Sequence, residues 1–339
     1  MTVKTNHIAI ELQNLTIGYH KGNFLLKILE NLNAGLHKGE LVCLVGENGV
    51  GKSTLLRTIS GVQQPLSGDV LIAGRSLHDI SSLELARTIS LVLTDRIYAG
   101  NLSVRELVAL GRYPYTNWLG NLRQEDQKKI EWALEITGTQ YLEDQLISEL
   151  SDGQFQKTLI ARALAQDSDM IILDEPTAHL DLVNKIIILK LLKDLASNTG
   201  KSILMATHEL ELSLQIADFI WMAFKKDRMV TGTPEDLIIN GSFNKMIHHD
   251  AIHFDDLHGR FKIKNTTDKL CSLTGERSVY FLTQNALNRK GWTISNEKSD
   301  VSINILKNDK EFIWQVKKDN IEKEAHTIKD MLDILKIKK

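Results

Sequence analysis

A glycine-rich loop with a lysine and two hydroxyl side chains follows an apolar run near the start of the chain. The loop reads Gly46-Glu47-Asn48-Gly49-Val50-Gly51-Lys52-Ser53-Thr54, which matches the spacing G-x-x-x-x-G-K-[ST], and the run before it is Leu41-Val42-Cys43-Leu44-Val45. Such glycines let backbone N–H groups point at one phosphate chain, and a helix starting near Lys52 adds its positive end. Lys52 can reach the β- and γ-phosphates, and the Ser53 hydroxyl can ligate Mg²⁺. The sequence therefore predicts a nucleoside triphosphate site made by Gly46, Asn48, Gly49, Gly51, Lys52, Ser53 and Thr54.

Two carboxylates and a histidine follow later apolar runs. Asp174 and Glu175 come directly after Met170-Ile171-Ile172-Leu173, and His208 comes after Met205-Ala206-Thr207. Because ligands bind at the carboxyl ends of parallel strands, we expect these side chains to face the phosphates. Asp174 would hold Mg²⁺ directly or through water, Glu175 would orient or deprotonate the attacking water, and His208 would contact the γ-phosphate. The alternatives are a solvated acidic turn and a structural histidine.

These residues need a scaffold, and the pattern predicts an α/β core with a mostly parallel sheet, because strands alternate with helices. We expect strands at 8–12, 15–19, 24–30, 41–45, 68–74, 170–173, 202–206 and 219–222, a turn at 31–39, and helices at 52–60, 124–137, 183–197 and 209–217. The segment from about 104 to 164 has a helical pattern. Ser103 and Glu106 fit a capping box at its start.

The character of the sequence changes past about residue 250. We expect a nucleotide-binding domain at 1–250, with a helical insertion at about 100–165, and a small α+β module at 255–339. In the module the pattern predicts strands at 261–264, 301–306 and 312–316, a hairpin at Asn308-Asp309, and helices at 278–290 and 320–337. The module carries 17 Lys/Arg and 13 Asp/Glu, an excess too small to imply nucleic acid. A structural or dimer-stabilising role and regulation by a bound ligand or protein both stay open.

The bulk properties are those of an ordinary globular protein. The chain has 339 residues, a formal net charge of −2 and two cysteines, Cys43 and Cys271. This charge gives no argument for a nucleic acid or an anionic membrane surface as partner. Two reduced thiols are expected rather than a disulfide. The start has no apolar signal region and no run of about 18 apolar residues exists, so any membrane role is expected to act through a partner.

A fourth motif, Leu150-Ser151-Asp152-Gly153-Gln154, lies before the strand that ends at Asp174. Together with the phosphate loop, the two carboxylates and His208, it resembles the ATP-binding cassette (ABC) family over residues 1 to about 250. The resemblance implies a P-loop ATPase core with an antiparallel β subdomain, and ATP and Mg²⁺ as cofactors. It also implies roles for residues outside the phosphate loop: Ser151, Gly153 and Gln154 would cap the γ-phosphate of a second subunit, Asp181 would bridge the two subunits, and Tyr19 would stack on adenine unless it is an ordinary strand tyrosine.

One chain carries one phosphate loop and one such motif, so the resemblance implies a head-to-tail pair of identical chains. Two positions depart from the family pattern. Asp152 replaces a glycine, and its carboxylate near ATP is unfavourable unless it points away. The family's usual glutamine, which touches Mg²⁺ and the attacking water, aligns with Thr94 or with Asp95 beside it. A Thr94 hydroxyl would reach the metal only through water.

The segment from Leu102 to Pro114 resembles the helical subdomain of importers for ferric siderophores, haem and cobalamin, as does Ala165-Gln166-Asp167. This resemblance implies a motor subunit on the cytoplasmic face of the inner or plasma membrane. Its partners would be polytopic permease subunits and, indirectly, an external substrate-binding protein. An exporter subunit is the alternative. A soluble relative acting on DNA or the ribosome is disfavoured, because the chain lacks a long coiled coil, a second cassette and a basic composition.

Overall fold

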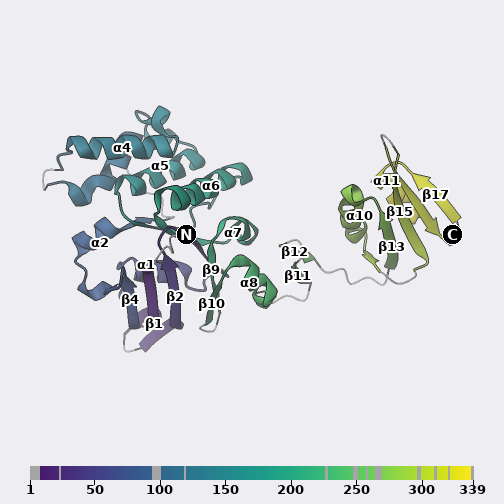
Figure 1. The fold of residues 1–339 in the computed structure, drawn as a ribbon, viewed down its shortest axis with the longest axis horizontal. Coiled ribbons are helices and arrows are strands. Elements are labelled where there is room, and N and C mark those ends of the chain that lie inside the picture. The colour runs from purple at the N-terminus through teal and green to yellow at the C-terminus, as the bar shows by residue number, and fades with distance from the viewer. Residues whose placement is uncertain are drawn as a thin grey trace, which may run out of the picture. The chain divides into compact units, whose positions relative to one another are not determined.

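The computed structural model describes residues 8–22, 24–93, 101–117, 120–225, 228–246, 251–256, 259–263, 269–295, 299–308, 311–319 and 321–336. The chain divides into two compact units. The first, the ATPase unit, comprises Met1–Met246 with Asp256–Arg260, and the second, the terminal unit, comprises Ile247–Asp255 with Phe261–Lys339. Figure 1 labels many of the elements of the two units.

A six-stranded sheet forms the centre of the ATPase unit, in the order β10-β9-β3-β8-β7-β6. Its strands are β3 (Leu41–Gly46), β6 (Ile89–Val92), β7 (Met170–Asp174), β8 (Ser202–Thr207), β9 (Phe219–Phe224) and β10 (Arg228–Gly232). All neighbours pair in parallel except β9 and β10, which are antiparallel. Every residue of β3, β7 and β8 is buried, as expected for strands covered on both faces. This arrangement confirms the predicted α/β fold and brings the carboxyl ends of β3, β7 and β8 to one edge.

An antiparallel sheet in the order β2-β1-β4-β5 packs on this core. Its strands are β1 (Ile8–Lys21), β2 (Phe24–His37), β4 (Ser67–Ile72) and β5 (Arg75–Ser76). The turn predicted at 31–39 is wrong for most of that range, because β2 continues to His37. Asn31 has a φ of +52°, and the pairing of β1 with β2 shifts register near it. The asparagine therefore makes a bulge inside one long strand and does not end the strand.

Helices complete the ATPase unit. They are α1 (Lys52–Ile59), α2 (Ser82–Thr88), α3 (Val104–Ala109), α4 (Gln124–Ile136), α5 (Asp152–Ala165), α6 (Leu182–Thr199), α7 (Leu210–Ile216), α8 (Pro234–Ile239) and α9 (Ser242–Lys245), with the 3₁₀ turns η1 (Leu77–Asp79), η2 (Leu110–Tyr115), η3 (Gln140–Leu142) and η4 (Ile147–Glu149). The predicted capping box of Ser103 and Glu106 starts α3. In Figure 1, α4 and α5 lie next to each other in the helical layer. No helix among the described residues is both long and apolar enough to cross a membrane.

The terminal unit contains a five-stranded sheet in the order β14-β13-β15-β16-β17. Its strands are β13 (Lys269–Gly275), β14 (Trp292–Ile294), β15 (Val301–Lys307), β16 (Phe312–Lys318) and β17 (Ile321–Ala325), its helices are α10 (Arg277–Arg289) and α11 (Ile328–Lys336), and β11 (Ile252–Asp255) and β12 (Arg260–Ile263) form a separate pair. The helix predicted at 320–337 is wrong for its first part, because β17 pairs with β16 before α11 begins. Strand β13 was not predicted. One face of the sheet packs with α10 and α11 around Trp314 and Met331.

Candidate functional site

The glycine-rich loop joins the buried end of β3 to the start of α1. Gly51 precedes the helix with a φ of +111°, a conformation that L-residues with a side chain rarely adopt. A Cβ atom at Gly51 would lie 2.4 Å from Ile28 Cγ2, so the position also demands a residue without a side chain. The first turn of α1 contains no acidic residue, and no side chain caps its N-terminus. The positive end of the helix is therefore available to an anion.

Three side chains from different elements form a chain of polar contacts above this loop. Lys52 Nζ lies 2.9 Å from Gly46 O and 3.3 Å from His208 Nδ1, and His208 Nε2 lies 2.5 Å from Glu175 Oε1. Because Lys52 donates, His208 accepts at Nδ1 and carries its proton at Nε2, facing the carboxylate. Burial lowers the pKa of Lys52, while the charges of Glu175 and Asp174 oppose this shift. The predicted residues Lys52, Glu175 and His208 thus meet at one place.

A cavity of about 310 Å³ lies over these groups. Its lining consists of Ile28, Asn48, Gly49, Gly51, Lys52, Ser53, Thr54, Glu175 and His208. Eight of the nine residues come from the phosphate loop or carry the carboxylate and imidazole that follow β7 and β8. The cavity therefore presents backbone N–H groups, an ammonium, two hydroxyls and a carboxylate to one bound molecule.

Asp174 ends β7 and is 4% exposed, and its Oδ1 atom has no hydrogen-bond partner among the described residues. A buried carboxylate oxygen without a donor is suited to a cation. Within the described chain, no three His, Cys, Asp or Glu side chains gather as a metal cage. Mg²⁺ is commonly bound by one or two protein oxygens together with phosphate oxygens and water. The hydroxyl of Ser53 and the carboxylate of Asp174 fit that mode of binding.

Glu175, next to Asp174, has an unusual backbone. Its φ is +48°, and its N–H donates to Ala206 O at 2.9 Å. The hydrogen bond crosses from the end of β7 to β8, which leads to His208. Non-glycine residues with positive φ are uncommon and concentrate at functional sites. Here the backbone conformation accompanies a side chain that turns to His208.

Tyr19 lies beside the phosphate loop but does not line the 310 Å³ cavity. Its hydroxyl is 2.9 Å from Thr54 Oγ1, and its side chain is 40% exposed. A neighbouring cavity of about 450 Å³ is lined by Gly18, Tyr19, His20, Arg57, Val62, Gln63 and Gln64. The aromatic ring therefore stands at the edge of the phosphate site, with open volume next to it.

Ser151, Gly153 and Gln154, here called the signature residues, lie at the start of α5 and do not line the phosphate cavity of this chain. Ser151 and Gln154 form a reciprocal capping box, with Ser151 N donating to Gln154 Oε1 at 2.9 Å. Gly153 is buried, and a Cβ atom there would lie 3.0 Å from the Asn184 side chain. Asn184 in turn donates to both carboxylate oxygens of Asp181, at 2.8 and 2.9 Å. Hydrogen bonds from Asn184 lower the pKa of Asp181.

Sequence reasoning missed several residues of the site. Ile28 lines the cavity from β2, Asn184 connects Gly153 to Asp181, and Lys225 at the end of β9 forms an ion pair with Glu47 of the loop. Ile28 and Lys225 carry no spacing signal, because each meets its partner only through the fold, and the same holds for Asn184 and Gly153. The expected metal-contacting residue Thr94, and Asp95 beside it, lie outside the described residues.

The fold and the cavity together define the class of protein. A parallel sheet covered on both faces presents a phosphate loop, a buried lysine and two strand-end carboxylates at one edge, which is the arrangement of a P-loop nucleoside triphosphatase. Comparison with known proteins narrows the class. Residues 29–178 match the ABC transporter family model, and residues 268–336 match a second model, the iron ABC transporter C-terminal domain.

The chain belongs to the family of ABC transporter ATP-binding proteins and is therefore an ATPase. It is 36% identical to an uncharacterized ABC transporter ATP-binding protein of Methanocaldococcus jannaschii, over 77% of this chain and 88% of that protein. It is 37% identical to the achromobactin transport ATP-binding protein of Dickeya dadantii, over 68% of this chain and 84% of that protein. Among solved structures it resembles one described as a metal-chelate type ABC transporter in an inward-facing conformation, with a TM-score of 0.59 and 30% identity over 68% of this chain and 85% of that one.

Proposed function

We propose that this chain is the ATP-hydrolysing subunit of an importer for an iron–siderophore complex. Two copies would dock head-to-tail beneath separate polytopic permease subunits at the cytoplasmic face of the membrane. ATP binding would close the pair and hydrolysis would reopen it, driving uptake of cargo delivered by an external binding protein. Haem and cobalamin are the other cargoes of this subfamily, and the test below separates the three.

The match of residues 268–336 to the iron ABC transporter C-terminal domain carries this proposal. That match lies outside the ATPase motifs, so it is independent of the features shared by all ABC proteins. The similarity to the achromobactin transport ATP-binding protein also supports the proposed cargo. We propose accordingly that residues 1–250 form the motor, with a helical insertion at about 100–165, and that 255–339 form an extension specific to this branch.

At the ATP site, the proposed roles follow from the contacts. Lys52 would neutralise the β- and γ-phosphates, Glu175 would take the proton of the attacking water, and His208 would hold that carboxylate through Nε2. Mg²⁺, held by Ser53 and Asp174, would neutralise developing charge on the phosphates. Tyr19 would stack on the adenine. Thr94 stays a proposed water-mediated contact to the metal.

Pairing of two chains is proposed because a single chain separates the two halves of the site. Ser151, Gly153 and Gln154 are absent from the lining of the cavity that holds Lys52 and Glu175. A second copy arranged head-to-tail would bring its Ser151 hydroxyl and the N-terminal end of its α5 to the γ-phosphate. Asp181, whose partner Asn184 lies close to Gly153, would then lie at the seam between the copies.

Affinity purification from detergent-solubilised membranes of the host tests the transporter role. A polytopic permease recovered in stoichiometric amount would support it, and uptake of radiolabelled iron–siderophore, haem or cobalamin by cells lacking the chain would identify the cargo. Loss of iron–siderophore uptake alone is expected. Recovery only with ribosomes or DNA would overturn the importer proposal, and loss of haem or cobalamin uptake alone would replace the cargo.

A further inference from the structure

The 3₁₀ turn η2 lies directly against the C-terminal end of α5. A Cβ atom at Gly111 would lie 2.2 Å from Arg162 O and 3.2 Å from Gln166 N. No side chain can occupy that space without moving one backbone away from the other. Two backbones in such close approach shift together, because neither has a flexible side chain between them that could absorb a displacement.

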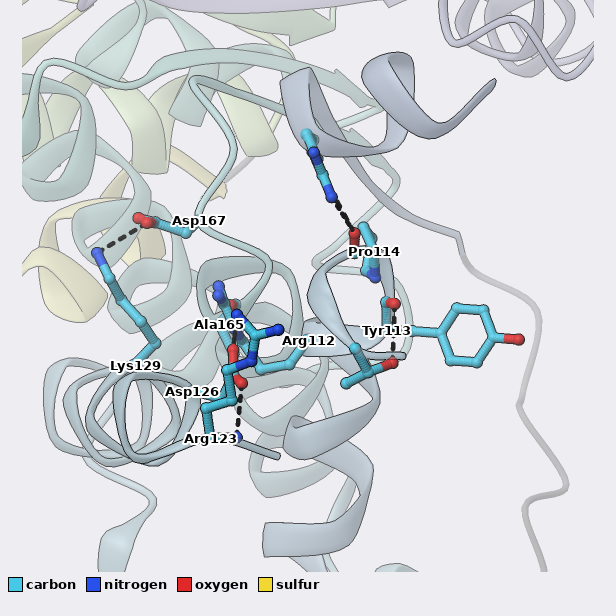
Figure 2. Close-up of polar contacts among 10 residues, drawn as sticks. Arg112, Tyr113, Pro114, Arg123, Asp126, Lys129, Ala165 and Asp167 are labelled. Atoms are coloured by element: carbon cyan, nitrogen blue, oxygen red, sulfur yellow. Dashed lines mark hydrogen bonds and ion pairs between the residues drawn. The ribbon is translucent and has the colours of Figure 1, made fainter. Parts of the chain in front are cut away.

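Arg112, the next residue, connects η2 to two helices through hydrogen bonds. Its side chain is 4% exposed, its Nε donates to Asp126 Oδ1 at 2.8 Å, and its Nη1 donates to Ala165 O at 2.8 Å. Asp126 belongs to the first turn of α4, where its Oδ2 accepts the Arg123 N–H, and Ala165 is the last residue of α5. Figure 2 shows Arg112 between Asp126 and Ala165. One guanidinium therefore joins three elements.

The same turn is connected to the central core. Arg87 of α2 donates from Nε and Nη2 to Pro114 O, at 3.1 and 3.0 Å. Two guanidinium groups lie over the ring of Tyr115, that of Arg112 at 4.0 Å and that of Arg87 at 5.1 Å from the ring centroid. Cations over an aromatic face attract it. Between these contacts the side chain of Tyr113, 76% exposed, points away from the helices into open space in Figure 2.

Helix α5 connects this junction to the signature residues. Its 14 residues run from Asp152, next to Ser151, to Ala165, which accepts from Arg112. At 1.5 Å per residue the helix spans about 21 Å. Its C-terminal end is further held by Ser90, whose hydroxyl donates to Ala163 O at 2.9 Å. A displacement of η2 therefore reaches Ser151 through one continuous helix.

We propose that Arg112 is a positioning residue that fixes α5, and through it Ser151, Gly153 and Gln154, relative to η2 and the exposed Tyr113. This inference rests on the proposed head-to-tail pairing, in which those three residues complete the partner's ATP site. Arg112 itself touches neither nucleotide nor reacting atoms. It fixes the position of the N-terminal end of α5, next to Ser151, when a second copy approaches.

The chemistry of the pair explains why arginine is required. Burial alone would raise the pKa of Asp126, but hydrogen bonds from Arg123 N–H and Arg112, with the Arg112 charge, outweigh it and lower the pKa. The carboxylate is therefore ionised, and removing Arg112 leaves a buried negative charge without its cation, held only by the Arg123 N–H. A lysine keeps the charge but lacks the planar fork that serves Asp126 and Ala165 O together.

The test uses the full chain with Arg112→Gln and Arg112→Lys. A Glu175→Gln chain with Arg112 intact tests separately whether two copies pair. We expect affinity for a fluorescent ATP analogue to stay within about twofold, because the phosphate loop is untouched. Turnover at saturating ATP, counted per molecule that binds nucleotide, should fall about tenfold in Arg112→Gln and less in Arg112→Lys. Backbone hydrogen exchange at 151–155 should become faster in the nucleotide-free chain. A purely stabilising residue would change the fraction of folded chain without changing turnover per binding molecule.

Lys129→Gln is the matched control. Lys129 also joins α4 to the segment after α5, through Asp167 at 2.7 Å, but the pair is 36% exposed on each side and, among the described residues, neither side chain hydrogen-bonds to η2. It should leave both readouts at the parent's level. Unchanged exchange at 151–155 in Arg112→Gln, or an equal change in Lys129→Gln, would overturn the proposal. If the Glu175→Gln chain fails to pair with Arg112 intact, the proposed function fails, and exchange in the nucleotide-free chain still decides the role of Arg112.

Discussion

The six-stranded sheet of the ATPase unit and the five-stranded sheet of the terminal unit differ in how their faces are covered. In the ATPase unit, strands β3, β7 and β8 are buried along their whole length. In the terminal unit, β15 and β16 alternate between buried and more exposed residues. Strand positions that face away from α10 and α11 carry polar residues such as Ser302, Asn304 and Gln315. One sheet therefore has two covered faces, and the other has one.

Burial of polar groups follows the same division. The described part of the ATPase unit buries charged side chains at Lys52, Arg112, Asp126 and Asp174. Within the described part of the terminal unit, Thr283 is the one buried polar side chain, and it accepts a hydrogen bond from Trp314 Nε1 at 2.9 Å. Buried charges are costly unless they are paired or used. The buried charges therefore lie in the unit that carries the phosphate loop.

Replacing a carboxylate in each unit gives the largest expected contrast. Glu175→Gln removes the proposed general base and should lower turnover by about 10²- to 10⁴-fold, while ATP still binds and traps a closed pair. Glu324→Gln makes the same chemical change on β17, where the side chain accepts from Gln315 at 3.0 Å, and should leave turnover unchanged. Steady-state phosphate release and size-exclusion chromatography with ATP measure both effects. Normal turnover in Glu175→Gln would sink its assigned role.

Replacing a tryptophan in each unit tests whether the two units fold separately. Trp314→Ala leaves a cavity in the core of the terminal unit. It should lower the free energy of unfolding of that unit by about 3–5 kcal/mol, comparable to the whole stability of a domain of this size. ATP binding should survive. Trp221→Ala makes the same change in the central sheet, beside Leu44 of β3, and should abolish ATP binding. Loss of ATP binding in Trp314→Ala would contradict separate folding of the units. Calorimetry and nucleotide titration provide the two measurements.

A lysine comparison yields a smaller effect. Lys52→Ala removes a charged donor to the phosphates and should weaken ATP binding about 10- to 100-fold, since hydrogen bonds to charged groups contribute about 1.5–3 kcal/mol. Lys323→Ala, on the exposed strand β17, should bind ATP like the parent. Equilibrium titration with a fluorescent ATP analogue measures both. Full affinity in Lys52→Ala would refute the interpretation of the phosphate loop.

What the sequence could predict depends on whether a contact is local or long-range along the chain. The phosphate loop, the strand ending at Asp174 and the capping box at Ser103 depend on neighbours within a few residues, so their patterns are visible in the sequence. The terminal strand β17 was mistaken for helix because its pairing with β16 depends on the sheet. Ile28 against Gly51 and Asn184 against Gly153 meet across 23 and 31 residues, and no spacing in the sequence indicates either contact.

The two cysteines give the smallest effect and test each core by its response to pH. Burial raises the pKa of Cys43 from 9.0 to about 12 and that of Cys271 from 9.0 to about 11. The folded state therefore keeps each proton after the unfolded state has lost it. Each thiol's contribution is fully present below pH 9 and declines above it, until about pH 11 for Cys271 and about pH 12 for Cys43. The slope per thiol is at most about 1.4 kcal/mol per pH unit.

Urea unfolding of the parent, Cys43→Ala and Cys271→Ala between about pH 8 and 10.5 measures these slopes, since other groups titrate equally in all three chains. Cys271→Ala should flatten the pH dependence of the terminal unit alone, and Cys43→Ala that of the ATPase unit alone. If either variant flattened both transitions, the two cores would not respond independently. If neither changed a slope, the thiols would already titrate in the folded chain near pH 9, and both cores would be more open to water than their burial indicates.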